Sequence, residues 1–163
     1  MTIDTRKLFE SLHTDYHAMV FRLCLGFVKG DHDQSRDLTQ EVFINTWNAL
    51  DKFHGASTYK TWIYRITVNT CLKYIRDKKD KQHISIETVS PAAEVSPATN
   101  ESQYQSLYRA IGQLNEVDRL IIIMVLDDME YEEIASVVGI SAVNLRVKIH
   151  RIKKELKKIL GNG

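Results

Sequence analysis

The sequence predicts an all-α protein of two small helical domains joined by a flexible linker, the second a helix-turn-helix domain of the winged-helix-like type. Apolar residues recur at steps of three and four along most of the 163 residues, which is typical of helices that bury one face. Glycine (seven residues) and proline (two) are scarce, and both disfavour helix interiors. Residues 83–106 contain both prolines and no lysine or arginine, as linkers often do.

These observations divide the chain into domains at residues 1–82 and 107–163, with a linker at 83–106. A coil of about 20 residues can stretch to about 65 Å, so the two domains could grip separate places on one DNA molecule. The net charge of +1 does not by itself indicate nucleic-acid binding.

The bulk properties predict a cytoplasmic protein with no direct membrane insertion. The N-terminal residues are too polar for a signal peptide. The longest apolar run, Leu120 to Leu126, is too short to span a bilayer. Cys24 and Cys71 each lie in an apolar helical pattern and are interpreted as buried thiols, which fits a reducing compartment.

The first helix is expected to be capped by Asp4 or Thr5 and to end at Phe27 or Val28. His13 and His17 stand four residues apart, a spacing that can bind a metal on one helix face. No third ligand lies near them in sequence. The prediction is therefore that the protein has no metal site and no cofactor.

A second helix is expected from about Gln34 to Leu50. Its apolar positions face the core or a partner, and a polar flank that includes Asp37, Gln40 and Glu41 faces outward. The following segment, residues 51–58, reads as a loop because Gly55 breaks the pattern. Ser57 or Thr58 can cap the next helix.

The third helix, expected from Tyr59 to Asp80, interleaves aromatic and basic residues. Rings can stack on unpaired bases while cations meet phosphates. The alternative is that Trp62 and Tyr64 belong to the core and the lysines to a solvated surface. These residues alone favour neither interpretation.

The second domain is expected to start with a helix from Leu107 to Leu114. Asn115 is then the predicted cap of a further helix, with Asp118 completing a capping box. The isoleucine-rich run that follows could be a strand by propensity. A helix is predicted because no second strand is visible to pair with it.

The stretch from Tyr131 to Leu160 predicts the helix-turn-helix. The first helix ends at Gly139, since glycine adopts a left-handed conformation at little cost, and Ser141 caps the second helix. Beyond Gly139 the charged residues are basic except for Glu155, whereas the segment from Leu114 to Glu133 is strongly acidic. This segregation focuses positive potential on the second helix and indicates DNA binding.

Taken together, four stretches resemble the extracytoplasmic-function (ECF) group of bacterial sigma factors in the sigma-70 superfamily. They are DLTQEVFINTW, FHGASTYKTWIYRITVNTCLKYIR, LNEVDRLIII and YEEIASVVGISAVNLRVKIHRIKKEL, in the order that the family has them. The resemblance implies a protein that joins core RNA polymerase and directs it to promoter DNA, with an anti-sigma factor as a further partner.

The resemblance also assigns roles to residues. In the first domain, it implies that Asp37, Gln40, Glu41 and Trp47 bind polymerase. The loop and third helix would melt and read the −10 element, with a flipped base held by the loop from His54 to Thr58. The implied −10 residues are His54, Ser57, Thr58, Trp62, Arg65, Asn69, Lys73, Tyr74 and Arg76. The implied −35 residues in the last helix are Asn144, Arg146, Lys148, His150 and Arg151.

The chain departs from the family pattern on its reading helix. Val143, Asn144 and Val147 stand where the family more often has Gly, Thr and Ser, so the resemblance implies the DNA-reading role of this helix but not its preferred DNA sequence.

Two other classes of protein fit the sequence less well. A stand-alone helix-turn-helix regulator explains the second domain but not the aromatic and basic third helix. An enzyme is not indicated: the adjacent Asp127 and Asp128 would point to different faces of a helix. The sequence has no GxxxxGK[ST] loop and no nucleophile–base set.

Overall fold

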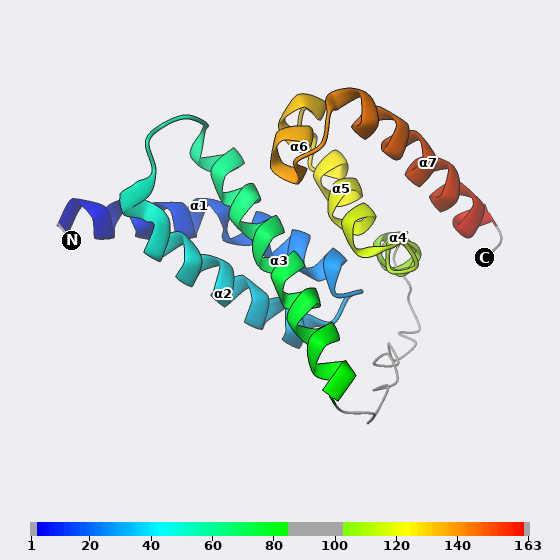
Figure 1. Ribbon diagram of the computed structural model, residues 1–163, viewed down its shortest axis with the longest axis horizontal. Coiled ribbons are helices and arrows are strands. Elements are labelled where there is room, and N and C mark those ends of the chain that lie inside the picture. The colour runs from blue at the N-terminus through cyan, green and yellow to red at the C-terminus, as the bar shows by residue number, and fades with distance from the viewer. Residues whose placement is uncertain (1–2, 85–102, 162–163) are drawn as a thin grey trace.

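The computed structural model describes residues 3–84 and 103–161, and the regular elements in these ranges are all helices (Figure 1). The first domain contains α1 (Ile3–Phe27), α2 (His32–Ala49), the short 3-10 helix η1 (Leu50–Lys52) and α3 (Tyr59–Ile84). The second contains α4 (Gln103–Ile111), α5 (Glu116–Leu126), α6 (Tyr131–Val138) and α7 (Ala142–Gly161). The predicted all-α class is confirmed, and the isoleucine-rich run forms α5.

Two predicted helix starts in the first domain are wrong. Helix α1 begins at Ile3, so neither Asp4 nor Thr5 is its cap. Helix α2 begins at His32 because the Asp31 carboxylate accepts a hydrogen bond from the Gln34 amide at 3.1 Å. The cap thus lies three residues before the predicted start.

The predicted linker is also too long at both edges. Helix α3 continues past Asp80 to Ile84, and α4 starts at Gln103 and ends at Ile111. These edges are polar, so their composition predicted a linker although they are helical. The body of the predicted linker, residues 85–102, lies outside the described residues.

The other predicted caps are confirmed. Thr58 Oγ1 accepts from the Thr61 amide at 3.1 Å, and Asn115 Oδ1 accepts from the Asp118 amide at 3.0 Å. Gly139 ends α6 in the left-handed region with φ of 84°. Ser141 Oγ accepts from the Asn144 amide at 3.1 Å at the start of α7.

The two domains pack against each other. Helix α1 contacts α5, and α3 contacts α6 (Figure 1). A Cβ atom on Gly26 of α1 would lie 2.7 Å from side-chain atoms of Ile123 in α5. Any larger residue at position 26 would require the Ile123 side chain to shift, so Gly26 is part of the domain contact.

A buried arginine connects the domains at the end of α1. Arg119 of α5 donates to the Phe27 carbonyl at 2.9 Å and to the Leu114 carbonyl at 2.6 Å. Its guanidinium also lies over the Phe27 ring, 5.4 Å from the centroid. A cation at this position suits the C-terminal end of a helix dipole. Burial lowers the pKa of Arg119, an effect that Glu116 opposes.

Candidate nucleic-acid interface

Helices α6 and α7 form the predicted helix-turn-helix. Ala135 is buried where the two helices cross, and Ile140 is half-buried in the turn between them. Helix α7 packs through a buried stripe made of Leu145, Ile149, Ile152 and Leu156. The stripe fixes which face of α7 points outward.

Four of the five predicted −35 residues lie on exposed positions of α7: Asn144, Arg146, His150 and Arg151. Lys148 is half-buried and lies nearer the buried stripe. The exposed set is therefore available to a DNA groove, and Lys148 sits at its margin.

Acidic side chains of the second domain hold two of these cations. Arg146 lies 3.3 Å from the Glu132 carboxylate of α6. Lys148 Nζ lies 3.4 Å from Asp118 Oδ1 of α5, and that carboxylate is only 17% exposed. Asp118 was predicted to complete a capping box, and its carboxylate instead faces α7. The exposed Arg146 pair is weak in water, worth under about 1 kcal/mol, so DNA can displace it.

The loop before α3 carries a cluster of aromatic rings. Phe53 stacks on Tyr59 with centroids 4.5 Å apart and lies 4.9 Å from the Trp62 ring. His54 and Thr58 are exposed beside it, and Ser57 is half-buried. Phe53 was not among the predicted site residues; its place beside the predicted base-binding loop was the signal available.

Five of the predicted −10 residues share one face of α3, because they recur at steps of three and four. Asn69, Lys73 and Arg76 are exposed on this face, and Arg65 and Trp62 are half-buried. Arg65 Nη2 donates to Ser136 Oγ of α6 at 2.9 Å. The −10 face thus touches the second domain through Arg65.

Tyr74 lies on another side of α3. It is half-buried, and its hydroxyl lies 3.4 Å from Gln34 Oε1 of α2. Burial raises its pKa, as do the nearby carboxylates of Asp31 and Asp37. The structure therefore separates Tyr74 from the other predicted −10 residues.

The predicted polymerase-binding residues lie on α2. Asp37, Gln40 and Glu41 are exposed, whereas Trp47 is half-buried with its ring 5.1 Å from that of Phe9. Ile44 is 59% exposed, and it stands three or four residues from Gln40 and Glu41. The exposed face of α2 thus pairs acidic and amide groups with an aliphatic side chain.

Comparison with known proteins matches this layout. The family model described as sigma-70 region 2 matches residues 12–81, and that described as sigma-70, region 4 matches residues 104–156. The ECF RNA polymerase sigma-E factor of Escherichia coli strain K12 is 31% identical over 166 aligned positions, covering 93% of this chain and 85% of that protein. RNA polymerase sigma factor SigV of Bacillus subtilis strain 168 is 25% identical, covering 94% of this chain and 91% of that protein.

The chain belongs to the ECF sigma factors of the sigma-70 family. It is a factor for transcription initiation that works with core RNA polymerase and promoter DNA. The stand-alone regulator is not favoured.

Two solved structures share the fold. One is the sigma factor RpoE in complex with the anti-sigma factor NepR from Bartonella quintana, with a TM-score of 0.83 and 20% identity over 95% of this chain and 98% of that one. The other is CnrH in complex with the cytosolic domain of CnrY, with a TM-score of 0.70 and 19% identity over 96% and 90% of the respective chains.

In this sigma factor, Tyr64 joins the domain contact rather than the −10 face. It is 1% exposed, and its hydroxyl donates at 2.8 Å to Oδ2 of Asp127, the residue that follows α5. Arg22 of α1 bonds the other carboxylate oxygen of Asp127 at 3.2 Å. Burial raises the pKa of Tyr64 above its ordinary value, and the Asp127 carboxylate raises it further. The sequence left open whether Tyr64 belongs to the core or stacks on bases. The structure places Tyr64 in the core.

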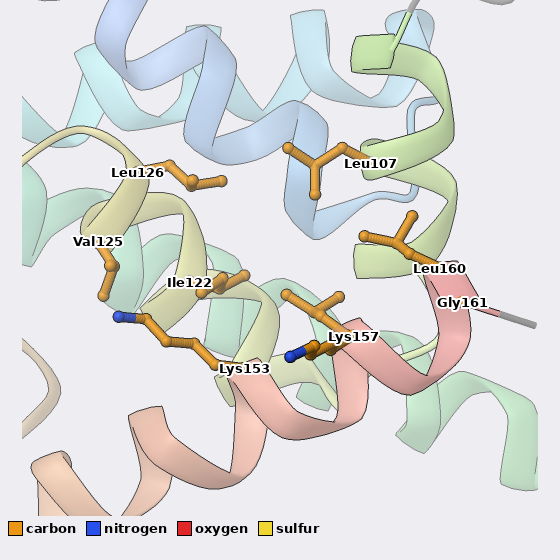
Figure 2. Close-up of a pocket in the computed structure, with 9 residues that line it drawn as sticks. Leu107, Ile122, Val125, Leu126, Lys153, Lys157, Leu160 and Gly161 are labelled. Carbon is orange, nitrogen blue, oxygen red and sulfur yellow. The ribbon is translucent and has the colours of Figure 1, made fainter.

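The second domain of the sigma factor also has an open apolar groove of about 560 Å³ (Figure 2). Leu107 of α4, Ile122 and Leu126 of α5, and Leu160 of α7 line it. Lys153 and Lys157 of α7 also line the groove. Leu126 and Leu160, which are 51% and 45% exposed, form part of the wall of this groove.

Helix α1 carries His13 and His17 four residues apart, and α1 and α3 each carry one cysteine. The rings of His13 and His17 are 5.1 Å apart. Within residues 3–84 and 103–161, no group of three or more His, Cys, Asp or Glu residues could hold a metal. Cys24 and Cys71 are buried free thiols, as predicted, and their sulfurs lie 4.0 Å apart. None of the helices in the described part of the chain is long and apolar enough to cross a membrane.

Proposed function

We propose that this sigma factor divides promoter recognition between its two domains. Residues 1–82 bind core polymerase and the −10 element, and residues 107–163 bind the −35 element. The observation that carries this proposal is the outward face of α7, where Asn144, Arg146, His150 and Arg151 are exposed opposite a buried stripe. An exposed basic helix of this kind suits the major groove.

Within the second domain, Arg146 is the principal base-reading residue. A guanidinium can pair with a guanine edge in bidentate fashion, which discriminates by about 1 to 3 kcal/mol. The lysines further along α7 meet phosphates and hold register without reading sequence.

In the first domain, the −10 face of α3 and the loop before it capture unstacked bases. The ring cluster of Phe53, Tyr59 and Trp62 gives stacking surface next to the exposed His54 and Thr58. Stacking is worth about 1 to 3 kcal/mol per base, so melting needs no ATP-hydrolysing site. The chain itself catalyses no reaction.

The exposed face of α2 binds core polymerase through Asp37, Gln40, Glu41 and the accessible part of Trp47. Its carboxylates suit a basic partner surface, and exposed Ile44 adds an apolar contact.

An anti-sigma factor is a further partner of this protein, as NepR is of RpoE. The protein acts in the cytoplasm, where the polymerase and its promoters are.

Run-off transcription with purified core polymerase on a pool of promoter fragments tests the proposal. The expected result is initiation at a restricted set of start sites that requires this chain. A pull-down separates it from a stand-alone regulator, which would bind duplex operator DNA and ignore the polymerase.

A further inference from the structure

The outward face of α7 carries two exposed aliphatic side chains among its polar residues. Val143 is 67% exposed and Val147 is 46% exposed. They stand four residues apart and therefore share one face of the helix. Single exposed apolar residues are common on protein surfaces, but these two lie one turn apart on the same face, and we call the pair the valine strip.

The strip lies at the centre of the outward face. With about 100° of rotation per residue, both valines lie about 160° from the buried Leu145. Arg146 lies on one side of the strip and Asn144 on the other. A helix that enters a groove with Arg146 and Asn144 at its flanks places Val143 and Val147 nearest the base edges.

The fold gives no reason for valine at these positions. Both side chains point away from the buried stripe, and valine is a poorer helix former than alanine. Neither side chain can bond a phosphate. Their chemistry instead fits an apolar group in the major groove, and among the bases thymine presents one, its C5-methyl group.

We infer that Val143 and Val147 read thymine methyl groups in the −35 element. The inference rests on the proposed major-groove role of α7 and deepens it, because it names the base group that the exposed valines of this helix would contact. Arg146 supplies the guanine contact and the valines supply the thymine contact, so the preferred duplex contains both bases within one turn of DNA.

The test uses the full chain bound to core polymerase. Promoter fragments that the complex retains are first selected from a pool with a randomised −35 region. Each thymine in the selected −35 duplex is then replaced singly by deoxyuridine, which removes the methyl group alone. We expect one or two replacements to weaken binding about fourfold each, the value for one buried methyl-sized group.

The same replacements are repeated with Val143→Ala and Val147→Ala. Alanine preserves helix α7, so these variants are expected to fold. Each should bind the thymine duplex more weakly and lose the penalty at its own deoxyuridine position. The control is Tyr104→Ala, which removes a 74% exposed side chain from α4 and should keep every penalty.

The outcomes separate the inference from the proposed function. If no −35 sequence is enriched, both are overturned. If a sequence is enriched but no deoxyuridine replacement weakens binding, the valine inference is wrong while the reading role of α7 stands. Penalties that persist unchanged in both valine variants would also overturn the inference.

Discussion

Asp127 shows how one side chain serves both domains of this sigma factor. Its two carboxylate oxygens accept from Arg22 and from Tyr64, which belong to α1 and α3. Arg22 is 48% exposed, so that ion pair contributes little on its own. The hydrogen bond from the buried Tyr64 hydroxyl matters more for stability than the Arg22 ion pair, because an unsatisfied buried donor costs about 1 to 3 kcal/mol.

Tyr64→Phe is expected to change how stability depends on pH. The pKa of Tyr64 is raised in the folded protein, so the stability it contributes is present below its unfolded pKa of about 10 and is lost as the pH rises above it. The wild-type free energy of unfolding should therefore fall above pH of about 10, by up to about 1.4 kcal/mol per pH unit for this proton.

Urea unfolding between about pH 9 and 11 measures this. The phenylalanine variant should show a shallower decline, because it lacks the Tyr64 proton. Some decline should remain, since Tyr74 and Tyr108, whose pKa values are also raised, still titrate. An identical decline in both proteins would show that Tyr64 does not contribute to the pH dependence of stability.

Arg146→Ala is expected to lower discrimination at one −35 base pair by about 1 to 3 kcal/mol, or about fivefold to 150-fold. Polymerase binding should be unchanged, because Arg146 is exposed on α7 and pairs with Glu132 of the neighbouring helix α6. Competition binding with single-base variants of the −35 element measures the change. Lys158→Ala is the control, expected to weaken all sequences alike. Equal loss of polymerase binding would mean that Arg146 supports the fold.

At the scale of the element, the turn between α6 and α7 decides where the reading helix points. Gly139 has φ of 84°, and an added Cβ there would meet nothing within 4 Å. Its requirement for glycine is therefore a matter of backbone conformation and not of space.

Gly139→Ala is expected to destabilise the protein by about 1 to 2 kcal/mol, the cost of the left-handed conformation for an L-residue. Binding to −35 duplex DNA should weaken with it. Gly161→Ala is the matched control, because that glycine ends α7, also has open space around it and has no positive φ. Thermal unfolding of the two variants measures the difference, and equal melting temperatures would contradict this account of the turn.

On α3, Asn69→Ala is expected to impair open-complex formation more than closed-complex binding, because Asn69 is exposed at the centre of the −10 face. Trp62→Ala should do the same, with an added loss of stability since its ring packs on Phe53. Permanganate footprinting detects unpaired thymines. Unchanged reactivity in the Asn69 variant, at equal promoter occupancy, would count against the assignment.

At the scale of the whole molecule, the packing of the two domains constrains how the sigma factor meets a promoter. Arg65, on the −10 face, bonds Ser136 of α6, and α3 packs against α6. Residues proposed to touch the −10 element and the helix-turn-helix therefore lie together in this arrangement.

Gly26→Val is expected to loosen the domain contact, because its Cβ would lie 2.7 Å from Ile123 and overpacking typically costs about 1 to 3 kcal/mol. Small-angle scattering should show a larger radius of gyration, and thermal stability should fall. Adding Ile123→Ala removes the clash and should restore part of the compactness. A variant as compact and stable as the wild type would show that the contact adapts around the side chain.

The sequence by itself determined the helical class, the helix-turn-helix and the exposure of most residues of the candidate site. The Thr58, Asn115 and Ser141 caps and the Gly139 turn depend on contacts within a few residues, so local patterns predict them. The exposed face of α7 follows in the same way from its apolar periodicity.

Only the tertiary structure decided how the domains meet. Arg22 and Asp127 are 105 residues apart in the chain, and Arg119 and Phe27 are 92 apart. The tertiary structure also decided that Tyr64 belongs to the core and that Tyr74 lies on a different side of α3 from the −10 face. The physical reason is that burial depends on which surfaces come together in space, and local periodicity does not encode that for a helix with both aromatic and basic faces.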